Sequence, residues 1–215
     1  MDRQPPDVKP KRAYDASRRR ELARQNHDSI IASAERRFLR DGYAPTTIRA
    51  IAADAEVSPD TIYKSFGGKP GLIRAIRTRA LQGERTIPAE QRSDELQATQ
   101  SDPRTIIQGW GRFTAEIAPR VSPILLLIRD AAATDPEVGA LLEEMDADRL
   151  RRMTLNARRL RDAGHLRAGT TLAQAADILW TYSSPELYEL LVLRRGWTPP
   201  RYGRFIADAM INTLL

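Results

Sequence analysis

The chain has 215 residues and carries 34 lysines and arginines against 28 aspartates and glutamates, a formal net charge of +6. It contains no cysteine, which excludes disulfides and thiolate metal sites. No apolar run approaches the roughly 18 residues that a membrane-spanning helix requires. The length allows two domains of ordinary size. We therefore expect a soluble, cytoplasmic protein of two domains, without membrane association.

The amino-terminal segment is polar and contains prolines. It reads MDRQPPDVKPKRAYD and lacks the apolar core of a secretory signal. We expect residues 1–18 to form a disordered basic arm.

Two short helices are predicted between Thr46 and Phe66, where the sequence reads TTIRAIAADAEVSPDTIYKSF. In the first helix, apolar side chains recur at helical spacing at Ile48, Ile51, Ala52 and Ala55. Ser58 then offers a hydroxyl that can cap a second helix. Pro59 takes the first helical position, where its missing N–H costs nothing. The pattern predicts a helix-turn-helix.

The second of these helices has one apolar and one polar face. Ile62 and Phe66 are four residues apart and can face inward together. Thr61, Lys64 and Ser65 then point outward. A helix of this kind can enter the major groove of DNA. The alternative is a pair of ordinary helices in an all-α core.

Charge is distributed unevenly along the chain. Residues 1–85 hold 18 basic and 11 acidic residues, a net charge of +7, whereas residues 86–215 hold 16 and 17, a net charge of −1. The positive excess therefore lies with the helix-turn-helix. This favours a nucleic-acid partner, because neutralising phosphates supplies much of the affinity for DNA.

The segment from about Arg24 to Ile76 resembles the amino-terminal domain of the TetR (tetracycline repressor) family of bacterial transcription regulators. The resemblance rests on spaced residues in and around the helix-turn-helix: Ile31, Ala34, Phe38, Gly42-Tyr43, Thr46-Thr47, Ile51-Ala52, Val57-Ser58, Thr61-Ile62-Tyr63, Phe66, Lys69 and Leu72. It implies an all-α fold with a three-helix DNA-binding domain and a larger helical domain for ligand binding and dimerisation. It also implies a homodimer whose small-molecule effector weakens binding to a double-stranded DNA operator.

The resemblance also assigns roles to residues of the helix-turn-helix. It implies a DNA-contacting set of Thr47, Arg49, Ser58, Pro59, Asp60, Thr61, Tyr63, Lys64 and Lys69. Thr47 would contact phosphate and cap the second helix of the three-helix domain, which is the first of the two short helices above, and Tyr63 would donate a phenolic hydrogen bond to phosphate. Lys69 would anchor the DNA backbone. The alternatives are a cap without DNA contact at Thr47, a half-buried core aromatic at Tyr63 and a merely solvated Lys69.

One position departs from the family pattern. The turn residue before Val57 is commonly glycine in the family, and here it is Glu56. A non-glycine residue with positive φ costs on the order of 1 kcal/mol. We therefore expect either a strained turn or a turn of different geometry.

The domain boundaries follow from changes in composition. We expect the helix-turn-helix domain over residues 19–82, a linker region around a short helix over 83–103, and a regulatory and dimerisation domain over 104–215. In the last, the sequence predicts one helix that ends near Pro119 and a second helix over 121–133. A long helix follows from Pro136 to Gly164. The remaining predicted helices cover residues 172–180, 185–193 and 202–214.

Two sets of residues in the carboxy-terminal half are candidates for ligand and partner contacts. Aromatic, methionine and charged residues within apolar helices are the pocket candidates: Trp110, Phe113, Ile117, Leu126, Arg129, Met145, Met153 and Trp180. The resemblance places a dimer seam on the last two long helices, with Leu187, Leu190, Leu191, Ile206, Met210 and Leu214. Ordinary core packing within one chain is the alternative for both sets.

The sequence favours a ligand-responsive, sequence-specific DNA-binding repressor. It offers only two histidines and no glycine-rich phosphate loop, G-x-S-x-G elbow or His-Glu-x-x-His motif, so we assign no catalytic residues, metal or cofactor. A constitutive DNA-binding regulator without an effector is the alternative and predicts a filled core. An α-helical enzyme is a third hypothesis.

Overall fold

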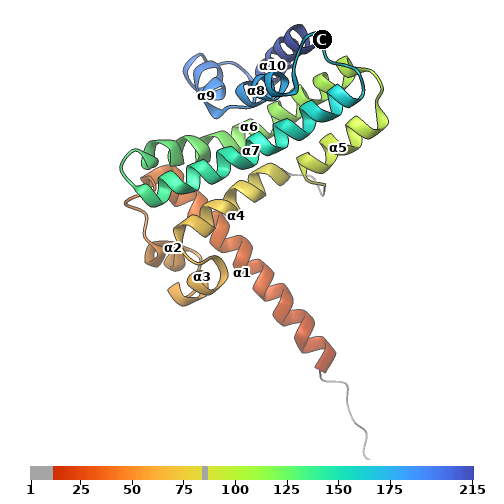
Figure 1. Cartoon of the computed structure of the whole chain (residues 1–215). Helices are drawn as coiled ribbons and strands as arrows, with labels where there is room; N and C mark the ends of the chain where they lie inside the picture. The colour runs from red at the N-terminus through yellow and green to blue at the C-terminus, as the bar shows by residue number, and fades with distance from the viewer. Residues whose placement is uncertain (1–11, 84–86) are drawn as a thin grey trace, which may run out of the picture.

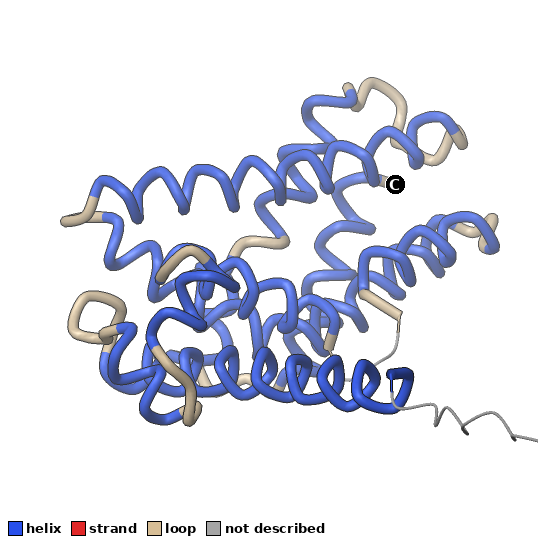
Figure 2. The backbone as a smooth tube through the Cα atoms, turned by 90° about the horizontal axis from the view of Figure 1, so that it is seen from below, coloured by secondary structure: helices blue, strands red, loops and turns tan. Residues whose placement is uncertain are grey.

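The structure is a computed structural model that describes residues 12–83 and 87–215, and every regular element within these ranges is helical. The all-α fold class is thereby confirmed. Figure 2 shows the helices and the loops that join them. The elements are α1 (Arg12–Asp41), α2 (Ile48–Asp54), α3 (Pro59–Phe66), α4 (Lys69–Gln82), α5 (Ala89–Thr99), α6 (Pro103–Ala132), α7 (Pro136–Asp162), α8 (Leu172–Tyr182), α9 (Pro185–Tyr188), the π-helix η1 (Glu189–Arg194) and α10 (Pro199–Leu214).

Helix α1 begins earlier than the sequence predicted. Residues 12–18 are helical, which corrects the disordered arm over 1–18; residues 1–11 lie outside the described part of the chain. The arginine-rich stretch contains good helix formers and no glycine or proline, and Glu21 pairs with Arg24 at 2.8 Å. The first part of α1 extends away from the remaining helices (Figure 1), and α1 becomes buried from Ile30 onward.

Helices α1 to α4 form the amino-terminal domain around one apolar core. Phe38, Ile51, Ile62 and Leu72 each come from a different helix, and each is fully buried. The core continues without interruption into the ends of α6 and α7, since Ile128 and Leu141, among others, belong to the same cluster. The amino-terminal domain is therefore packed directly on the larger helical body.

Helix α6 is longer than predicted because it continues through two prolines. The sequence predicted an end near Pro119, but the helix runs from Pro103 to Ala132 with Pro119 and Pro123 inside it. A proline in a helix interior removes one hydrogen bond and costs about 3 kcal/mol. Packing against α4, α5, α7, α9 and α10 offsets this cost. A prediction from local sequence patterns does not take such packing into account.

The body is built around α6, α7 and α10. Helices α6 and α10 cross closely at Gly111 and Gly203, where each backbone lies against the carbonyl of the other glycine. Helix α7 begins at Pro136, as predicted, with the Asp135 side chain accepting from the first backbone amides. It ends before Gly164, which has a φ of 72°. Helices α5 and α8 flank the two long helices α6 and α7 (Figure 1).

Candidate nucleic-acid interface and effector cavity

The two helices of the helix-turn-helix begin where the sequence predicted. Thr47 caps α2, with its hydroxyl accepting from the Ala50 amide at 3.1 Å. Ser58 caps α3 by accepting from the Thr61 amide at 3.2 Å, and Pro59 follows at the first helical position. The predicted caps are confirmed. Each cap satisfies a backbone amide in the first turn of its helix and so fixes where that helix begins.

The turn between α2 and α3 is strained, as one of the two expectations proposed. Glu56 has a φ of 55°, and no other described non-glycine residue has a positive φ. The side chain is exposed. The left-handed conformation costs roughly 1–2 kcal/mol for a residue with a Cβ. The neighbouring Ala55 and Ile51 are buried in the domain core, and this packing holds the turn in place.

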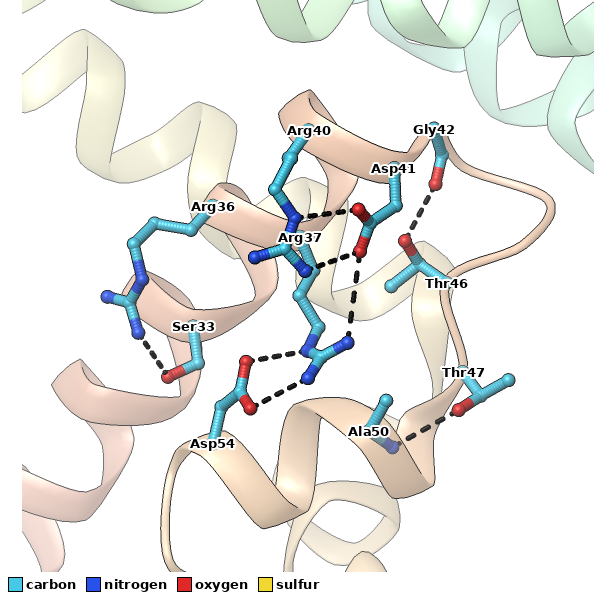
Figure 3. Close-up of polar contacts among 10 residues, drawn as sticks. All are labelled: Ser33, Arg36, Arg37, Arg40, Asp41, Gly42, Thr46, Thr47, Ala50 and Asp54. Atoms are coloured by element: carbon cyan, nitrogen blue, oxygen red, sulfur yellow. Dashed lines mark hydrogen bonds and ion pairs between the residues drawn. The ribbon is translucent and has the colours of Figure 1, made fainter.

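An ion pair fastens α2 to α1 behind the turn (Figure 3). The Arg37 guanidinium donates to both carboxylate oxygens of Asp54 at 2.6 and 2.7 Å, and a second carboxylate, Asp41, lies 3.8 Å away. The hydrogen bonds from Arg37 lower the pKa of Asp54 below its ordinary value. Thr46 donates to the carbonyl of Gly42, the residue directly after α1, at 2.7 Å and closes the α1–α2 loop.

Most of the implied DNA-contacting residues lie on the open surface of the helix-turn-helix. Ile62 is fully buried, so α3 rests on the core with that face. Tyr63 is 54% exposed and belongs to neither apolar core cluster, so it is not a core aromatic. The other exposed members of the set are Thr47, Arg49, Ser58, Pro59, Asp60 and Lys64; Thr61 is half-buried. Asp60 places a carboxylate among them.

Lys69 has internal partners instead of being merely solvated. Its ammonium donates to the Tyr43 carbonyl at 2.6 Å and lies 4.2 Å from the centre of the Tyr43 ring. Burial lowers the pKa of Lys69, and burial together with the nearby Glu137 and Asp135 carboxylates raises the pKa of Tyr43 to about 12. Lys69 therefore holds the α1–α2 loop against the start of α4.

A cavity of about 190 Å³ lies in the body between α4, α5, α6, α7, α8 and α10. Its walls are mostly apolar. Five of the eight predicted pocket residues line it: Trp110, Phe113, Ile117, Met145 and Met153. The wall also includes Leu125, Leu179 and Tyr202.

The three other predicted pocket residues do not line this cavity. Leu126 is buried in the core, and the Trp180 ring lies under the Arg149 guanidinium at 4.3 Å. Arg129 is one-third exposed and pairs with Glu189 at 2.9 Å. Its charge is thus satisfied by carboxylates of its own chain, which the sequence could not show because Glu189 lies 60 residues away.

Polar residues of the cavity wall were missed by the sequence analysis. Ser93 lies in the segment expected to be a linker, which contains helix α5. Asn156, Arg149 and Arg152 come from α7. Asn156 follows Met145 and Met153 at helical spacing, and an asparagine on such an apolar stripe is the signal that could have revealed it.

Two cavity residues belong to the helix that connects the two domains. Arg77 and Leu81 of α4 line the cavity, and Arg77 pairs with Asp148 of α7 at 3.2 Å. Burial lowers the pKa of the Arg77 guanidinium. One turn earlier, Arg74 pairs with Glu144 through two hydrogen bonds at 2.8 and 2.5 Å. Helix α4 therefore links the cavity wall directly to the helix-turn-helix domain.

The predicted dimer residues divide into two groups. Ile206, Met210 and Leu214 are buried against the rest of their own chain, which corrects their assignment to a dimer interface. The amphipathic pattern marked the buried face of α10, and α6 of the same chain covers it. Leu187 and Leu191 are partly buried in the same cluster. Leu190 is 49% exposed and remains open to a partner.

The helix-turn-helix and the cavity together define a class of protein. A capped helix-turn-helix with an exposed second helix, set on an all-α body that contains an apolar cavity, is the architecture of a DNA-binding transcription regulator. Within residues 12–83 and 87–215, no helix has the length and apolar character to cross a membrane. The same ranges contain no cluster of three side chains suited to hold a metal ion.

A comparison with protein-family models identifies the amino-terminal domain. Residues 30–76 match the family model described as bacterial regulatory proteins, tetR family. This match covers the helix-turn-helix and the helices beside it, so the amino-terminal domain is of the TetR type. No curated protein matches the sequence.

Solved structures of low sequence identity share the fold over most of the chain. One is a SmeT–triclosan complex, with 22% identity and a TM-score of 0.67 over 88% of this chain and 91% of that one. A second is NalD, the secondary repressor of the MexAB-OprM multidrug efflux pump in Pseudomonas aeruginosa, with 17% identity and a TM-score of 0.68 over 90% and 97%. A third is a TetR-family regulator from Syntrophomonas wolfei, with 18% identity and a TM-score of 0.69 over 87% and 93%.

Proposed function

We propose that the protein is a ligand-responsive transcriptional repressor that binds a specific DNA operator as a homodimer. The observation that carries the proposal is the exposed α3 surface, on which Tyr63 and Lys64 point away from a core that buries Ile62. An exposed tyrosine of this kind suits a hydrogen bond to phosphate. The exposed lysine suits phosphate neutralisation.

The other members of the DNA-contacting set have different proposed roles. Thr47 and Arg49 lie exposed at the start of α2 and would contact phosphates, while Ser58, Pro59, Asp60 and Thr61 would approach the groove at the start of α3. Lys69 would act mainly by fixing the α1–α2 loop, because its ammonium already donates to the Tyr43 carbonyl. Carboxylates at Asp60 and Glu56 repel phosphate and would oppose non-specific binding.

The proposed dimer uses exposed apolar residues of the carboxy-terminal helices. Leu190 and Leu193 of η1 are 49% and 55% exposed, and Phe205 of α10 is 40% exposed. Large apolar side chains that are this exposed suit a partner interface when they form a patch. Trp197 packs edge-on against Phe205 at 5.5 Å between ring centres and joins the helices. We propose this surface in place of the buried face of α10.

The proposed ligand response passes through α4. An effector in the cavity would contact Arg77 and Leu81, and α4 carries the helix-turn-helix at its other end. A ligand shifts such an equilibrium only by the difference in its affinity for the two arrangements. The cavity itself favours an effector over a constitutive regulator, for which a filled core was expected. No catalytic role is proposed, because the family is one of transcription regulators.

Fluorescence anisotropy with a duplex selected from random sequence tests the DNA-binding role. We expect Tyr63→Phe and Lys64→Ala to weaken binding to this duplex, with Lys64→Ala also reducing the salt slope by about one unit. The matched control is Arg158→Ala, which removes one exposed positive charge from the body. Unchanged affinity in both α3 variants, or an equal loss in the control, would contradict the proposed interface.

A further inference from the structure

One corner of the cavity is polar and is built from two helices. Ser93 of α5 and Asn156 of α7 line the cavity and are 6% and 5% exposed. Gln97 connects them, since its amide nitrogen donates to the Ser93 carbonyl and to Asn156 Oδ1, both at 3.2 Å. The Trp110 indole donates to Ser93 Oγ at 3.0 Å. These contacts fix how each polar group faces the cavity.

The Asn156 amide presents a donor to the cavity. A carbonyl oxygen can only accept, so the Gln97 atom that faces the Ser93 carbonyl is the amide nitrogen, and the Asn156 atom beside that nitrogen is therefore the oxygen. The remaining atom of the Asn156 amide is its NH₂ group, which donates to no group in the described part of the chain. The nitrogen keeps accessible surface, and Asn156 lines the cavity. It is therefore accessible from the cavity.

Ser93 provides a second donor at the same corner. Its oxygen accepts from the Trp110 indole, so its own proton is left to donate. Within residues 12–83 and 87–215 that proton has no acceptor. Two donors without acceptors thus border one apolar cavity, and a buried donor that stays unpaired is unfavourable.

Each arginine of the cavity wall is already paired with a carboxylate. Arg149 pairs with Asp146 at 3.1 Å, and Arg77 pairs with Asp148 at 3.2 Å. Arg152 pairs with Asp94, just behind the wall, at 2.6 Å. An anionic ligand would bring a charge into this wall without a free cation to meet it, which costs free energy.

We propose that the cavity recognises an uncharged aromatic compound that carries a carbonyl oxygen, bound by the Asn156 amide and the Ser93 hydroxyl. This inference rests on the proposed effector role and names the chemical class of the effector. The size agrees with one substituted ring, since an engineered apolar cavity of about 150 Å³ binds benzene and this cavity measures about 190 Å³. Trp110 and Phe113 supply an aromatic wall beside the two donors.

Three compounds of nearly the same shape test the proposal by NMR titration of the ligand signals, without DNA. Acetophenone has the carbonyl, α-methylstyrene replaces its oxygen by CH₂, and benzoate replaces the acetyl group by a carboxylate. We expect acetophenone to bind about tenfold or more tightly than either of the others, the effect of a buried acceptor that satisfies the donors. Equal binding of acetophenone and α-methylstyrene, tighter binding of benzoate, or no binding of acetophenone would overturn the proposal.

Variants of the polar corner identify the donors. Asn156→Leu and Ser93→Ala should each reduce the preference for acetophenone over α-methylstyrene by several-fold. Thr114→Val, which changes a different cavity hydroxyl, should leave the preference unchanged. Circular dichroism shows which variants fold, and Ser93→Ala tests the corner if Asn156→Leu does not. An unchanged preference in a folded corner variant would overturn the assignment.

The binding assay separates this inference from the proposed function. If acetophenone binds with the expected preference but leaves operator affinity unchanged, the recognition chemistry stands and the effector role of this site fails. If the preference is absent, the chemical class is wrong whatever happens at the operator.

Discussion

At the crossing of α6 and α10, close packing makes a glycine-to-alanine substitution destabilising, although alanine is the better helix former. A Cβ added at Gly111 would lie 2.5 Å from the Gly203 carbonyl oxygen and 2.8 Å from the Ala207 Cβ. Carbon atoms in van der Waals contact are about 3.5–4.0 Å apart, so the methyl group is roughly 1 Å too close. The obstacle includes backbone, which cannot rotate away. Gly111→Ala therefore requires the two helices to separate.

The expected magnitude combines two opposing terms. Overpacking of a well-packed core costs typically about 1–3 kcal/mol. Alanine in a helix interior is more favourable than glycine by roughly 0.5–1 kcal/mol. We expect Gly111→Ala to lower the free energy of unfolding by about 1–2 kcal/mol.

Gly139 of α7 provides the matched control, because the same change meets open space there. The nearest atom to an added Cβ is the Ala132 carbonyl oxygen at 3.9 Å. Gly139→Ala should therefore raise the free energy of unfolding by about 0.5–1 kcal/mol. Urea denaturation at one fixed protein concentration measures both variants. A Gly111→Ala variant as stable as wild type, or two variants that change in the same direction, would refute the close packing of α6 on α10.

Three further predictions concern the amino-terminal domain and the body. Glu56→Gly should stabilise the protein by up to about 1 kcal/mol by removing the strain of the positive φ, whereas Glu56→Gln keeps the strain and should not, as measured by urea denaturation. Thr47→Ala should cost about 1 kcal/mol through the lost cap, and Thr47→Ser should recover most of it in the same assay. Asp94 has a lowered pKa because Arg152 and Arg159 donate to it, so its contribution to stability is present above its ordinary pKa near 4 and is lost as the pH falls through the lower folded value. The stability difference between wild type and Asp94→Asn should therefore shrink from pH 7 to pH 3, and a constant difference would show that the carboxylate charge does not contribute.

Local rules were sufficient for the helix-turn-helix. Ser58 and Pro59 gave the start of α3, and Glu56 marked the turn that proved to be strained. Each of these features depends on residues within a few positions in the chain. Capping and backbone strain are local effects, so the sequence contains the information that predicts them.

Several features of the body depend on contacts between residues that are far apart in the chain, so local sequence patterns do not predict them. Helix α6 continues through Pro119 because surrounding helices stabilise it, and those helices are distant in the chain. Amphipathic spacing identified Ile206 as a residue that needs burial but not the partner that buries it. The polar corner depends on α5 meeting α7, with Gln97 and Asn156 separated by 59 positions. Patterns within one helix cannot report such pairings.

Selection of duplexes from a random-sequence pool tests the central claim, that this chain is a sequence-specific DNA-binding regulator acting as a dimer. A dimer that presents two α3 helices to successive major grooves selects half-sites one helical turn apart, about 34–36 Å. The account predicts enrichment of one two-fold symmetric consensus that still binds in the presence of excess unrelated duplex. A pool that remains random after repeated selection, with binding no tighter than to unrelated DNA, would contradict it.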